Sequence, residues 1–206
     1  MKIRCSALGG IMTNPKKKTE KLSAGCKTFI KDLVKEELFG YKSKIESKYL
    51  TKGTDVEDAS IDLYNEVYDT LYLKNTVRLE NDFISGECDI NGDGLIVDVK
   101  SSWSLETFPA TPQDINNKGY EWQLRGYMWL YEQPRAELAY CIVNTPDELL
   151  KNWDDKSIHK VDRIPAELRI TKVHFERDTE KEALIEQRVK DCREFYNEYK
   201  NQILNK

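Results

Sequence analysis

Two strand-forming runs joined by a glycine-rich turn constrain the fold of this chain more than any other feature. The runs span residues 83–90 and 95–101, and the turn at residues 91–94 reads Asn-Gly-Asp-Gly. Such a turn between two strand-forming runs is typical of a hairpin. Another strand-forming run, at residues 76–80, precedes them. We therefore predict an antiparallel meander of three strands.

The second strand of the hairpin carries an acid and a base on one face. Because side chains alternate along a strand, Asp98 and Lys100 project together, while Val97 and Val99 face the opposite side. An acid and a base in an otherwise apolar strand are unfavourable to bury, unless they are exposed or hold a metal and a substrate. With Asp89 on the preceding strand, the hairpin holds two carboxylates and one ammonium group.

The hairpin residues alone leave open a surface hairpin with a cross-strand ion pair. Calcium binding is a further alternative, because Asp89-x-Asn91-x-Asp93-Gly94 matches the start of an EF-hand loop. That loop requires a bidentate Glu at its twelfth position, where this sequence has Lys100. Its flanks are helices, whereas this sequence favours strands. The EF-hand is therefore excluded.

Apolar residues at helical spacing predict helices on both sides of these strands. The first covers residues 29–38 and ends near Gly40, and the second starts at a Thr54–Glu57 capping box and continues to about residue 72. The remaining elements are a helix at 113–131, strands at 137–143 and 169–175, and a helix at 179–199. This order predicts an α/β fold with a layered sheet.

Charge is distributed unevenly along the chain. The formal net charge is -4, yet residues 1–53 hold 13 Lys or Arg against 5 Asp or Glu, which leaves 19 basic and 31 acidic residues for residues 54–206. A basic N-terminal region suits contact with a polyanion, and a solvated Lys-rich helix explains it equally well. Net charge therefore does not exclude a nucleic-acid substrate.

Length, hydropathy and cysteine content predict one soluble domain inside the cell. A chain of 206 residues with 39% apolar residues can bury one sizeable core. Its start does not resemble a secretory signal, and no run approaches the roughly 18 apolar residues that a membrane helix needs. Cysteines without a CxxC pair favour reduced thiols over disulfides or a zinc site. These are Cys5, Cys26, Cys88, Cys141 and Cys192.

A series of polar landmarks follows the chain from its start to the middle. In order they are Arg4, Gly53, Glu57, Asp89, Asp98-Val99-Lys100 and Gln123. This order and spacing resemble the lambda exonuclease and YqaJ-type viral recombinase family of the PD-(D/E)XK superfamily. That family has an early Arg, a Gly four residues before a helical Glu, an Asp, a (D/E)xK strand and a helix with a Gln. Residues 176–178 and the helix after them also resemble the end of that family, so the likeness spans nearly all of the chain.

Two departures from the family pattern concern the end of the hairpin. Asp98 stands where lambda exonuclease has Glu, which the superfamily pattern allows, and Ser101-Ser102 stand where that enzyme has Cys-Pro. Ser102 is therefore only a further candidate site residue. Iron–sulfur nucleases of the RecB type share the spacing from Gln123 to Tyr127, but they need a cysteine cluster near the C-terminus. The single Cys192 there argues against one.

The resemblance implies a PD-(D/E)XK core, which is a mixed central sheet flanked by helices, and a magnesium-dependent reaction centre. Two Mg²⁺ ions, for which Mn²⁺ can substitute, would be bound by Asp89 and Asp98, with the carbonyl of Val99 completing one coordination sphere. Lys100 would orient the attacking water or help to deprotonate it. Glu57 would bind metal directly or through water, although the capping box alone also explains a Glu at this position.

The resemblance assigns roles to several further residues. Gln123 would touch the active site, and Tyr127, one helical turn away, is either a further site residue or part of an aromatic core. Arg4, with Ser6 as a helper, would grip a terminal 5'-phosphate through its planar guanidinium, although an Arg near a chain start is usually just solvated. The two histidines, His159 and His174, are too scattered for a histidine-based site and are expected to be structural.

The implied function is that of a 5'-to-3' exonuclease on double-stranded DNA, which leaves a 3' single strand for phage-type recombination. The alternatives are a nuclease of another polarity, an endonuclease on the same fold, and an inert DNA-binding or regulatory module. Implied partners are DNA ends, a single-strand annealing protein and further copies of the chain in a trimeric ring, in the cytoplasm of a bacterial host. No membrane is expected.

We expect a single nuclease domain over residues 1–206. Its parts would be a basic N-terminal helical region (1–53), a catalytic core (54–143), an irregular insertion (144–168), and a C-terminal strand and helix (169–206).

Overall fold

The computed structural model of the protein describes residues 1–43, 47–115 and 118–206. In chain order its elements are β1 (Ile3–Arg4), η1 (Cys5–Ala7), α1 (Leu8–Ile11), α2 (Ala24–Phe39), α3 (Lys48–Asp55), α4 (Glu57–Tyr68), β2 (Leu79–Glu80), β3 (Ile84–Gly86), β4 (Ile90–Gly92), β5 (Leu95–Ser101), η2 (Pro112–Asp114), α5 (Lys118–Tyr131), β6 (Arg135–Cys141), η3 (Asp147–Leu149), η4 (Lys156–Ile158), η5 (Ala166–Leu168), β7 (Ile170–Glu176) and α6 (Thr179–Leu204), where η marks a 3-10 helix.

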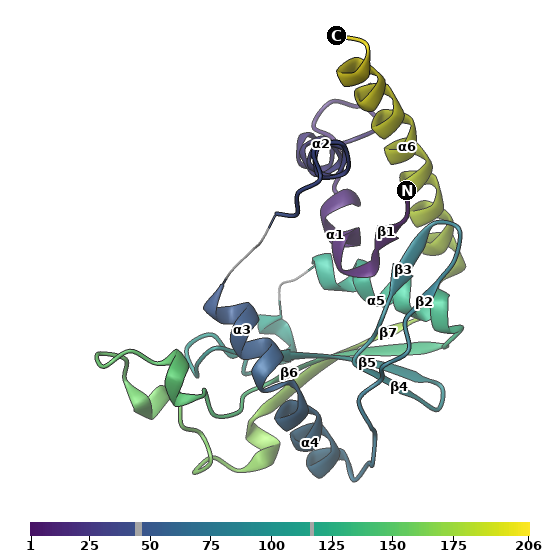
Figure 1. Ribbon diagram of the computed structural model, residues 1–206. Helices are drawn as coiled ribbons and strands as arrows, with labels where there is room; N and C mark the ends of the chain where they lie inside the picture. The colour runs from purple at the N-terminus through teal and green to yellow at the C-terminus, as the bar shows by residue number, and fades with distance from the viewer. Residues whose placement is uncertain (44–46, 116–117) are drawn as a thin grey trace.

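A mixed sheet with the order β4-β5-β6-β7 lies at the centre of the fold (Figure 1). β5 and β6 pair in parallel, whereas β4 and β7 are antiparallel to their neighbours. Ile96 on β5 packs in the same core as Leu124 of α5, and Val97, on the opposite face, packs with Ile61 of α4. One helix thus covers each face of the sheet, and the predicted mixed sheet flanked by helices is confirmed.

The predicted hairpin at the glycine-rich turn exists as β4 and β5, and β2 pairs antiparallel with β3, but the three predicted strands do not form one meander. The run at residues 83–90 is divided between β3, which lies in a smaller sheet of order β1-β3-β2, and β4, which lies in the central sheet. Between the two strands the chain pairs with Asn75, whose side chain donates to the carbonyl of Cys88 and whose backbone N–H donates to that of Asp89. Asp89 therefore lies in the crossing between two sheets, not within a strand.

The helix predicted from residue 54 to about residue 72 exists only over α4, Glu57–Tyr68, and its predicted capping box is wrong. Thr54 lies in the last turn of α3, where its hydroxyl donates to the carbonyl of Leu50. The helix breaks at Val56, which precedes α4 and offers no side-chain cap, and α4 ends before Asp69, a residue in the left-handed conformation. Glu57 thus occupies the first turn of a separate helix.

The other predicted elements differ mainly in their limits. The helix predicted at 113–131 is the 3-10 helix η2 followed by α5; its residues 116–117 lie outside the described residues, as do residues 44–46 of the basic N-terminal region. The last helix continues to Leu204.

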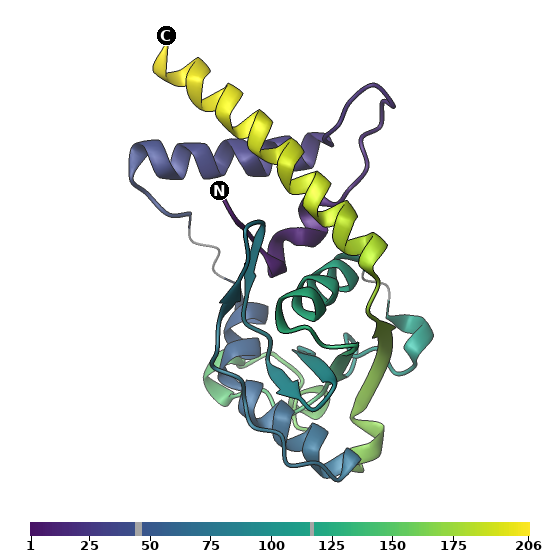
Figure 2. The same ribbon diagram turned by 90° about the vertical axis from the view of Figure 1, so that its right-hand side faces the viewer.

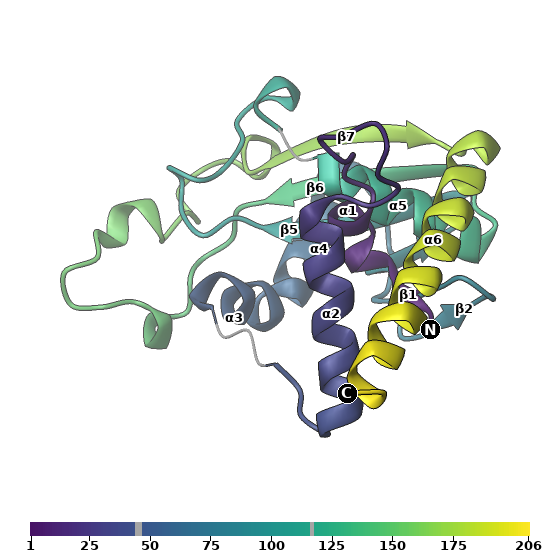
Figure 3. The same ribbon diagram turned by 90° about the horizontal axis from the view of Figure 1, so that it is seen from above.

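Helices α2 and α6 cross above the sheet (Figures 2 and 3). α2 ends at Gly40, where the left-handed conformation (φ 67°) suits a glycine, as predicted. At the crossing the Sγ atoms of Cys26 and Cys192 lie 3.5 Å apart. All five cysteines are free and buried. None of the helices in the described parts of the chain has the length and apolar content that crossing a membrane requires.

Candidate nuclease active site

A cleft of about 450 Å³ opens where α3, the start of α4, the end of β5 and the start of α5 meet, and we call it the carboxylate cleft. The residues predicted from the sequence that line it are Ser6, Glu57, Asp89, Val99, Lys100 and Gln123. Asp98 lies fully buried beside them, in contact with Lys100 and Gln123. Residues from five separate parts of the chain thus converge on one site.

Asp98 is held from both of its oxygens. Gln123 Nε2 donates to Asp98 Oδ1 at 3.0 Å, and Lys100 Nζ lies 2.6 Å from Asp98 Oδ2. The ammonium of Lys100 also lies 4.9 Å from the centre of the Tyr120 ring. Although burial acts to lower it, the charges of Asp98 and Asp89 raise the pKa of Lys100 above its usual value. Lys100 is therefore a fixed cation at neutral pH.

Asp89 reaches the same centre from the crossing between the two sheets. Its Oδ2 accepts a hydrogen bond of 2.7 Å from the backbone N–H of Val99, which fixes the carboxylate against β5. Burial, and next the negative charge of Asp98, raise the pKa of Asp89 to about 7. The two acids thus repel each other in a buried place, an arrangement that a cation would relieve.

Glu57 lies at the rim of the carboxylate cleft, in the first turn of α4. Its Oε2 is 3.1 Å from Lys74 Nζ. The capping-box explanation of Glu57 fails, because Thr54 belongs to the preceding helix. What remains is an acid that faces Asp89 and is neutralised in this structure by Lys74.

Three predicted site residues lie outside the lining of the cleft. Arg4 is exposed on β1, two positions before Ser6, and its side chain forms no hydrogen bond or ion pair with the described residues. Tyr127 is buried, and its hydroxyl accepts from Gln123 Nε2 at 3.0 Å, so it supports Gln123 from within the core. Ser102 is also buried, with its carbonyl engaged by Lys52.

The two histidines also lie outside the cleft. His159 is buried, and its Nδ1 lies within hydrogen-bond distance of Thr145 Oγ1 and of the carbonyl of Trp103. His174 lies 3.0 Å from Glu137 on the neighbouring strand. Both contacts join parts of the fold, in agreement with the structural roles predicted.

Sequence reasoning missed the aromatic and apolar wall of the cleft. Tyr120 precedes Gln123 by one helical turn, and Tyr140 pairs with Lys100 across β5 and β6. Helical spacing could have found Tyr120, whereas Tyr140 required the strand register. Tyr49 and Leu50, on α3, are more than half exposed and line the opposite rim.

A buried lysine, Lys52, fastens α3 to the sheet, and no sequence signal indicated it. Its Nζ donates to the carbonyl of Ser102 at 2.6 Å and to the carbonyls of Trp103 and Val143, both at 3.1 Å. Its side chain is fully buried, and burial lowers its pKa to about 8.

The donor set of the cleft fits a hydrated Mg²⁺. Among the described residues, no three His, Cys, Asp or Glu side chains converge closely enough to ligate an ion by themselves. Mg²⁺ needs fewer protein ligands, because it binds through one or two carboxylates and keeps several waters. Asp98 Oδ2 is buried and receives no aligned hydrogen bond despite the nearby Lys100, and Asp89 lines the same cleft. The two carboxylates and the carbonyl of Val99 could therefore hold the ion.

The central sheet between two helices, with Asp98-Val99-Lys100 on β5 and Asp89 just before β4, is the fold of the PD-(D/E)XK nucleases. No protein-family model matches the sequence, and a search of curated proteins found no match. Among solved structures, the phage-related exonuclease from Haemophilus somnus 129PT is similar, with 33% sequence identity and a TM-score of 0.92 over 98% of this chain and 96% of that one. The chain belongs to this family of phage-related, lambda-exonuclease-like nucleases.

A more distant likeness shows the fold alone. The alkaline exonuclease LHK-Exo from Laribacter hongkongensis is 15% identical, with a TM-score of 0.70 over 99% of this chain and 92% of that one. The same enzyme in complex with dAMP is 16% identical, with a TM-score of 0.66 over 98% of this chain and 91% of that one.

Proposed function

We propose that this protein is a Mg²⁺-dependent exonuclease that degrades double-stranded DNA from the 5' end and leaves a 3' single strand for phage-type recombination. The observation that carries the proposal is the convergence of Asp89 and Lys100 in one cleft with Asp98 buried directly beside them. Membership of the exonuclease family supports the nuclease activity. Polarity and the duplex substrate are inferred from the resemblance of the sequence.

The residues of the cleft divide the work of phosphodiester hydrolysis. Asp89, Asp98 and the carbonyl of Val99 would hold two Mg²⁺ ions, or Mn²⁺ in their place, with Glu57 as a direct or water-mediated ligand. When bound, such ions neutralise the phosphate and lower the pKa of a coordinated water. Lys100, as a fixed cation, would orient the attacking water or a phosphate oxygen.

Gln123 has a positioning role beside these groups. Its amide donates to Asp98 Oδ1 and to the hydroxyl of Tyr127, so it fixes the carboxylate that the reaction uses. Ser102 would act only through the backbone, because its side chain is buried away from the cleft.

Arg4 would recognise the terminal 5'-phosphate, with Ser6 in the cleft as its helper. The guanidinium of Arg4 is exposed and has no partner among the described residues, so it is available to an anion. We expect Arg4→Ala to lose the preference for 5'-phosphorylated over 5'-hydroxyl ends, and Arg4→Lys to keep part of it. Equal discrimination by Arg4→Ala and the parent would remove this role.

The working form would be a homo-oligomer, namely a ring of three chains around the DNA. A single-strand annealing protein would receive the single-stranded product. Two leucines between α4 and β2 support an interface, because Leu71 is 95% and Leu73 is 85% exposed. Light scattering should give a mass near three chains, and Leu71→Asp should lower it. A strict monomer at micromolar concentration would refute the trimeric ring, but it would not affect the assignment of the active site to the carboxylate cleft.

The deciding experiment follows a linear duplex labelled at its 5' or its 3' end, with and without Mg²⁺. We expect metal-dependent, early release of the 5' label as a mononucleotide, while the 3' label stays in long fragments. Early release of the 3' label would reverse the polarity, and cutting of a closed circular duplex would indicate an endonuclease. No cleavage under any divalent ion would refute the nuclease assignment.

A further inference from the structure

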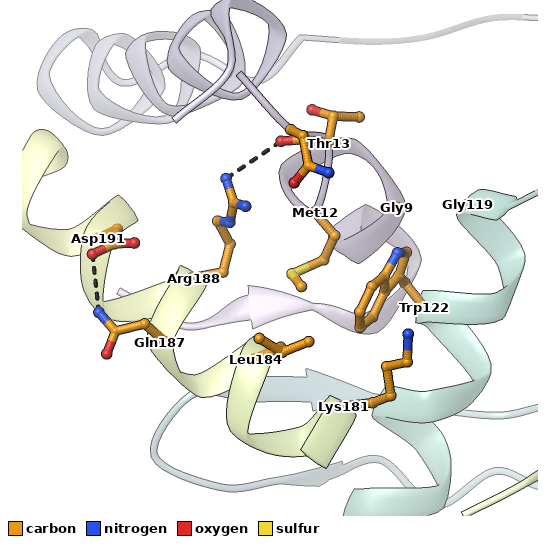
Figure 4. A pocket seen from close by; sticks show the side chains of 11 residues that line it. Gly9, Met12, Thr13, Gly119, Trp122, Lys181, Leu184, Gln187, Arg188 and Asp191 are labelled. Carbon is orange, nitrogen blue, oxygen red and sulfur yellow. Dashed lines mark hydrogen bonds between the residues drawn. The ribbon is translucent and has the colours of Figure 1, made fainter. Parts of the chain in front are cut away.

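A second hollow, of about 580 Å³, lies beside the carboxylate cleft, and we call it the α6 hollow (Figure 4). Gly9 and Gly119 line the α6 hollow, whereas Ser6 and Tyr120, from the same two segments, line the cleft. The backbones of Gly9 and Gly119 touch, since a Cβ on Gly9 would lie 2.5 Å from Gly119 Cα. The two openings are therefore neighbours across the contact of α1 with α5.

The floor of the α6 hollow is apolar and is formed by side chains from three separate segments. Met12 follows α1, Trp122 comes from α5, and Leu184 comes from α6, and Figure 4 shows the three side chains around one space. Leu184 is 52% exposed, so part of this apolar surface is open to solvent. Its volume lies within the roughly 300–1,000 Å³ that ligand pockets span.

Cations surround the apolar floor. Lys181 Nζ lies 5.2 Å from the centre of the Trp122 ring and forms no ion pair with a described acid. Arg188 is fixed by hydrogen bonds to the carbonyls of Thr13 and Lys21. The acid in this lining, Asp191, accepts from Gln187 and lies 3.7 Å from Lys21 Nζ, which pairs more closely with Glu194 at 2.8 Å.

The positive character continues beyond the α6 hollow. A further hollow of about 500 Å³ shares Thr13 and Asn14 with it and reaches Lys16 and Lys17. Glu20, the acid there, is paired with Lys27 at 2.7 Å. A path from Trp122 to Lys17 thus combines one aromatic ring with cations that the described acids do not neutralise.

We propose that the α6 hollow binds single-stranded DNA, with one base against Trp122 and the neighbouring phosphates at Lys181, Lys16 and Lys17. Aromatic rings between cations are the usual means of holding a single strand without sequence preference. The flexible side chain of Lys181 can leave the ring for a phosphate. A peptide would be favoured by an apolar surface with mixed charges, whereas Lys181, Lys16 and Lys17 form no ion pair with the described acids and remain available to phosphates.

This inference rests on the proposed function, which gives the single strand a source. Hydrolysis of one strand in the carboxylate cleft leaves its complement unpaired next to the α1 and α5 contact. The α6 hollow would then hold that complement and keep it from pairing again. The protein would then have two DNA sites: the carboxylate cleft for the strand that is cut, and the α6 hollow for the strand that remains.

The test measures binding of a fluorescein-labelled oligothymidylate of about 12 nucleotides by anisotropy, in EDTA so that nothing is cut. We expect Lys181→Glu to weaken binding roughly tenfold, and Trp122→Leu to do the same. Lys181 is in the first turn of α6, where an acid is favourable, so Lys181→Glu should fold. Lys151→Glu is the matched control, because Lys151 Nζ lies 5.1 Å from the Trp153 ring, far along the chain, and the net charge changes equally.

The outcomes separate this inference from the proposed function. If Lys181→Glu and Lys151→Glu weaken oligothymidylate binding equally, the single-strand site is overturned, because net charge then explains the effect. A change in the mass of the protein with Leu184→Asp, at unchanged oligothymidylate affinity, would overturn it in favour of a protein contact. Asp98→Asn should bind oligothymidylate like the parent while it cuts no DNA. A parent that cuts no duplex would refute the proposed function instead.

Discussion

Lys52 Nζ lies 2.6 Å from the carbonyl oxygen of Ser102, two residues beyond Lys100 in the sequence. With the carbonyls of Trp103 and Val143, this contact joins α3 to the ends of β5 and β6. The rim residues of α3 are thus positioned by a charged group in the interior, where a charge is costly to place.

The stability of the protein should report the buried charge of Lys52. Its pKa is about 8 in the fold and 10.5 ordinarily, so between these values the unfolded chain holds a proton that the folded chain has released. The free energy of unfolding should therefore rise with pH, by roughly 1.4 kcal/mol per pH unit. Urea unfolding at pH 8 to 10 should show this rise in the parent relative to Lys52→Met, which has the same thiols and tyrosines. Parallel pH profiles would contradict it.

Asp98→Asn should remove activity and keep the fold. The amide has the shape of the carboxylate but no charge, and losing about 4 kcal/mol of charge stabilisation slows cleavage roughly a thousandfold. Asp93→Asn, in the exposed turn of the same hairpin, is the matched control and should cleave at the parental rate. Initial rates on a 5'-labelled duplex, with circular dichroism to check folding, measure both. Near-parental turnover by a folded Asp98→Asn protein would exclude the assigned centre.

Glu57 and Lys74 should have opposite effects on the metal requirement. Glu57→Gln removes a negative charge at the rim of the cleft, and Lys74→Met removes the cation that neutralises it at 3.1 Å. We expect the Mg²⁺ concentration for half-maximal rate to rise by about threefold to tenfold in the first variant and to fall in the second. Titration of the rate with MgCl₂ measures both. A shift in the same direction for the two variants would show that Glu57 serves only to anchor Lys74.

Two adjacent glycines in α1 should respond differently to alanine. A Cβ on Gly9 would lie 2.5 Å from the backbone of Gly119, whereas a Cβ on Gly10 meets nothing within 4 Å. Gly9→Ala should lower the free energy of unfolding by about 1–3 kcal/mol, because backbone must move. Gly10→Ala should leave it unchanged or raise it by up to about 1 kcal/mol. Denaturant unfolding that ranks the two variants the other way would contradict the packing of α1 on α5.

The thiols should be protected in the folded protein. Burial raises the pKa of Cys88 and of Cys141 from 9.0 to about 12, so their thiolate fraction at pH 8 falls by about a thousandfold. Iodoacetamide labelling followed by mass spectrometry should be slow in buffer and complete in urea. The folded form keeps protons that the unfolded form releases, so these thiols lower stability as pH rises above 9. Rapid labelling of either cysteine in buffer would contradict their burial.

The chemistry of the site was predictable where it depends on local periodicity. The alternation of a strand placed Asp98 and Lys100 on one face, and the spacing of a helix placed Tyr127 next to Gln123; both relationships exist. The landmark order predicted that Asp89 and Glu57 would join them, although they belong to different elements.

The rest depended on interactions between distant segments. Asn75 diverts the chain at Cys88, and so divides one strand-forming run between two sheets. The break at Val56 has no proline or glycine to mark it, and Thr54 with Glu57 imitates a helix start. The sequence around Lys52 is typical of a solvated lysine, because the carbonyl groups that bind it lie about 50 and 91 positions away in the chain.

The bond from the Val99 amide to Asp89 spans only ten residues, and it also has a consequence for the order of folding. When only the hairpin of β4 and β5 has formed, both acids already lie close together. Gln123 can bind Asp98 only after α5 has packed on the sheet. β6 must pair in parallel with β5 across a long intervening segment. Non-local pairing is slower than hairpin closure. We therefore expect an early species with paired, unsupported carboxylates, in which divalent ions would speed the later steps. Pulse-labelled hydrogen exchange should protect the Val99 amide before the amides of β6; simultaneous protection would show that the site assembles in one step.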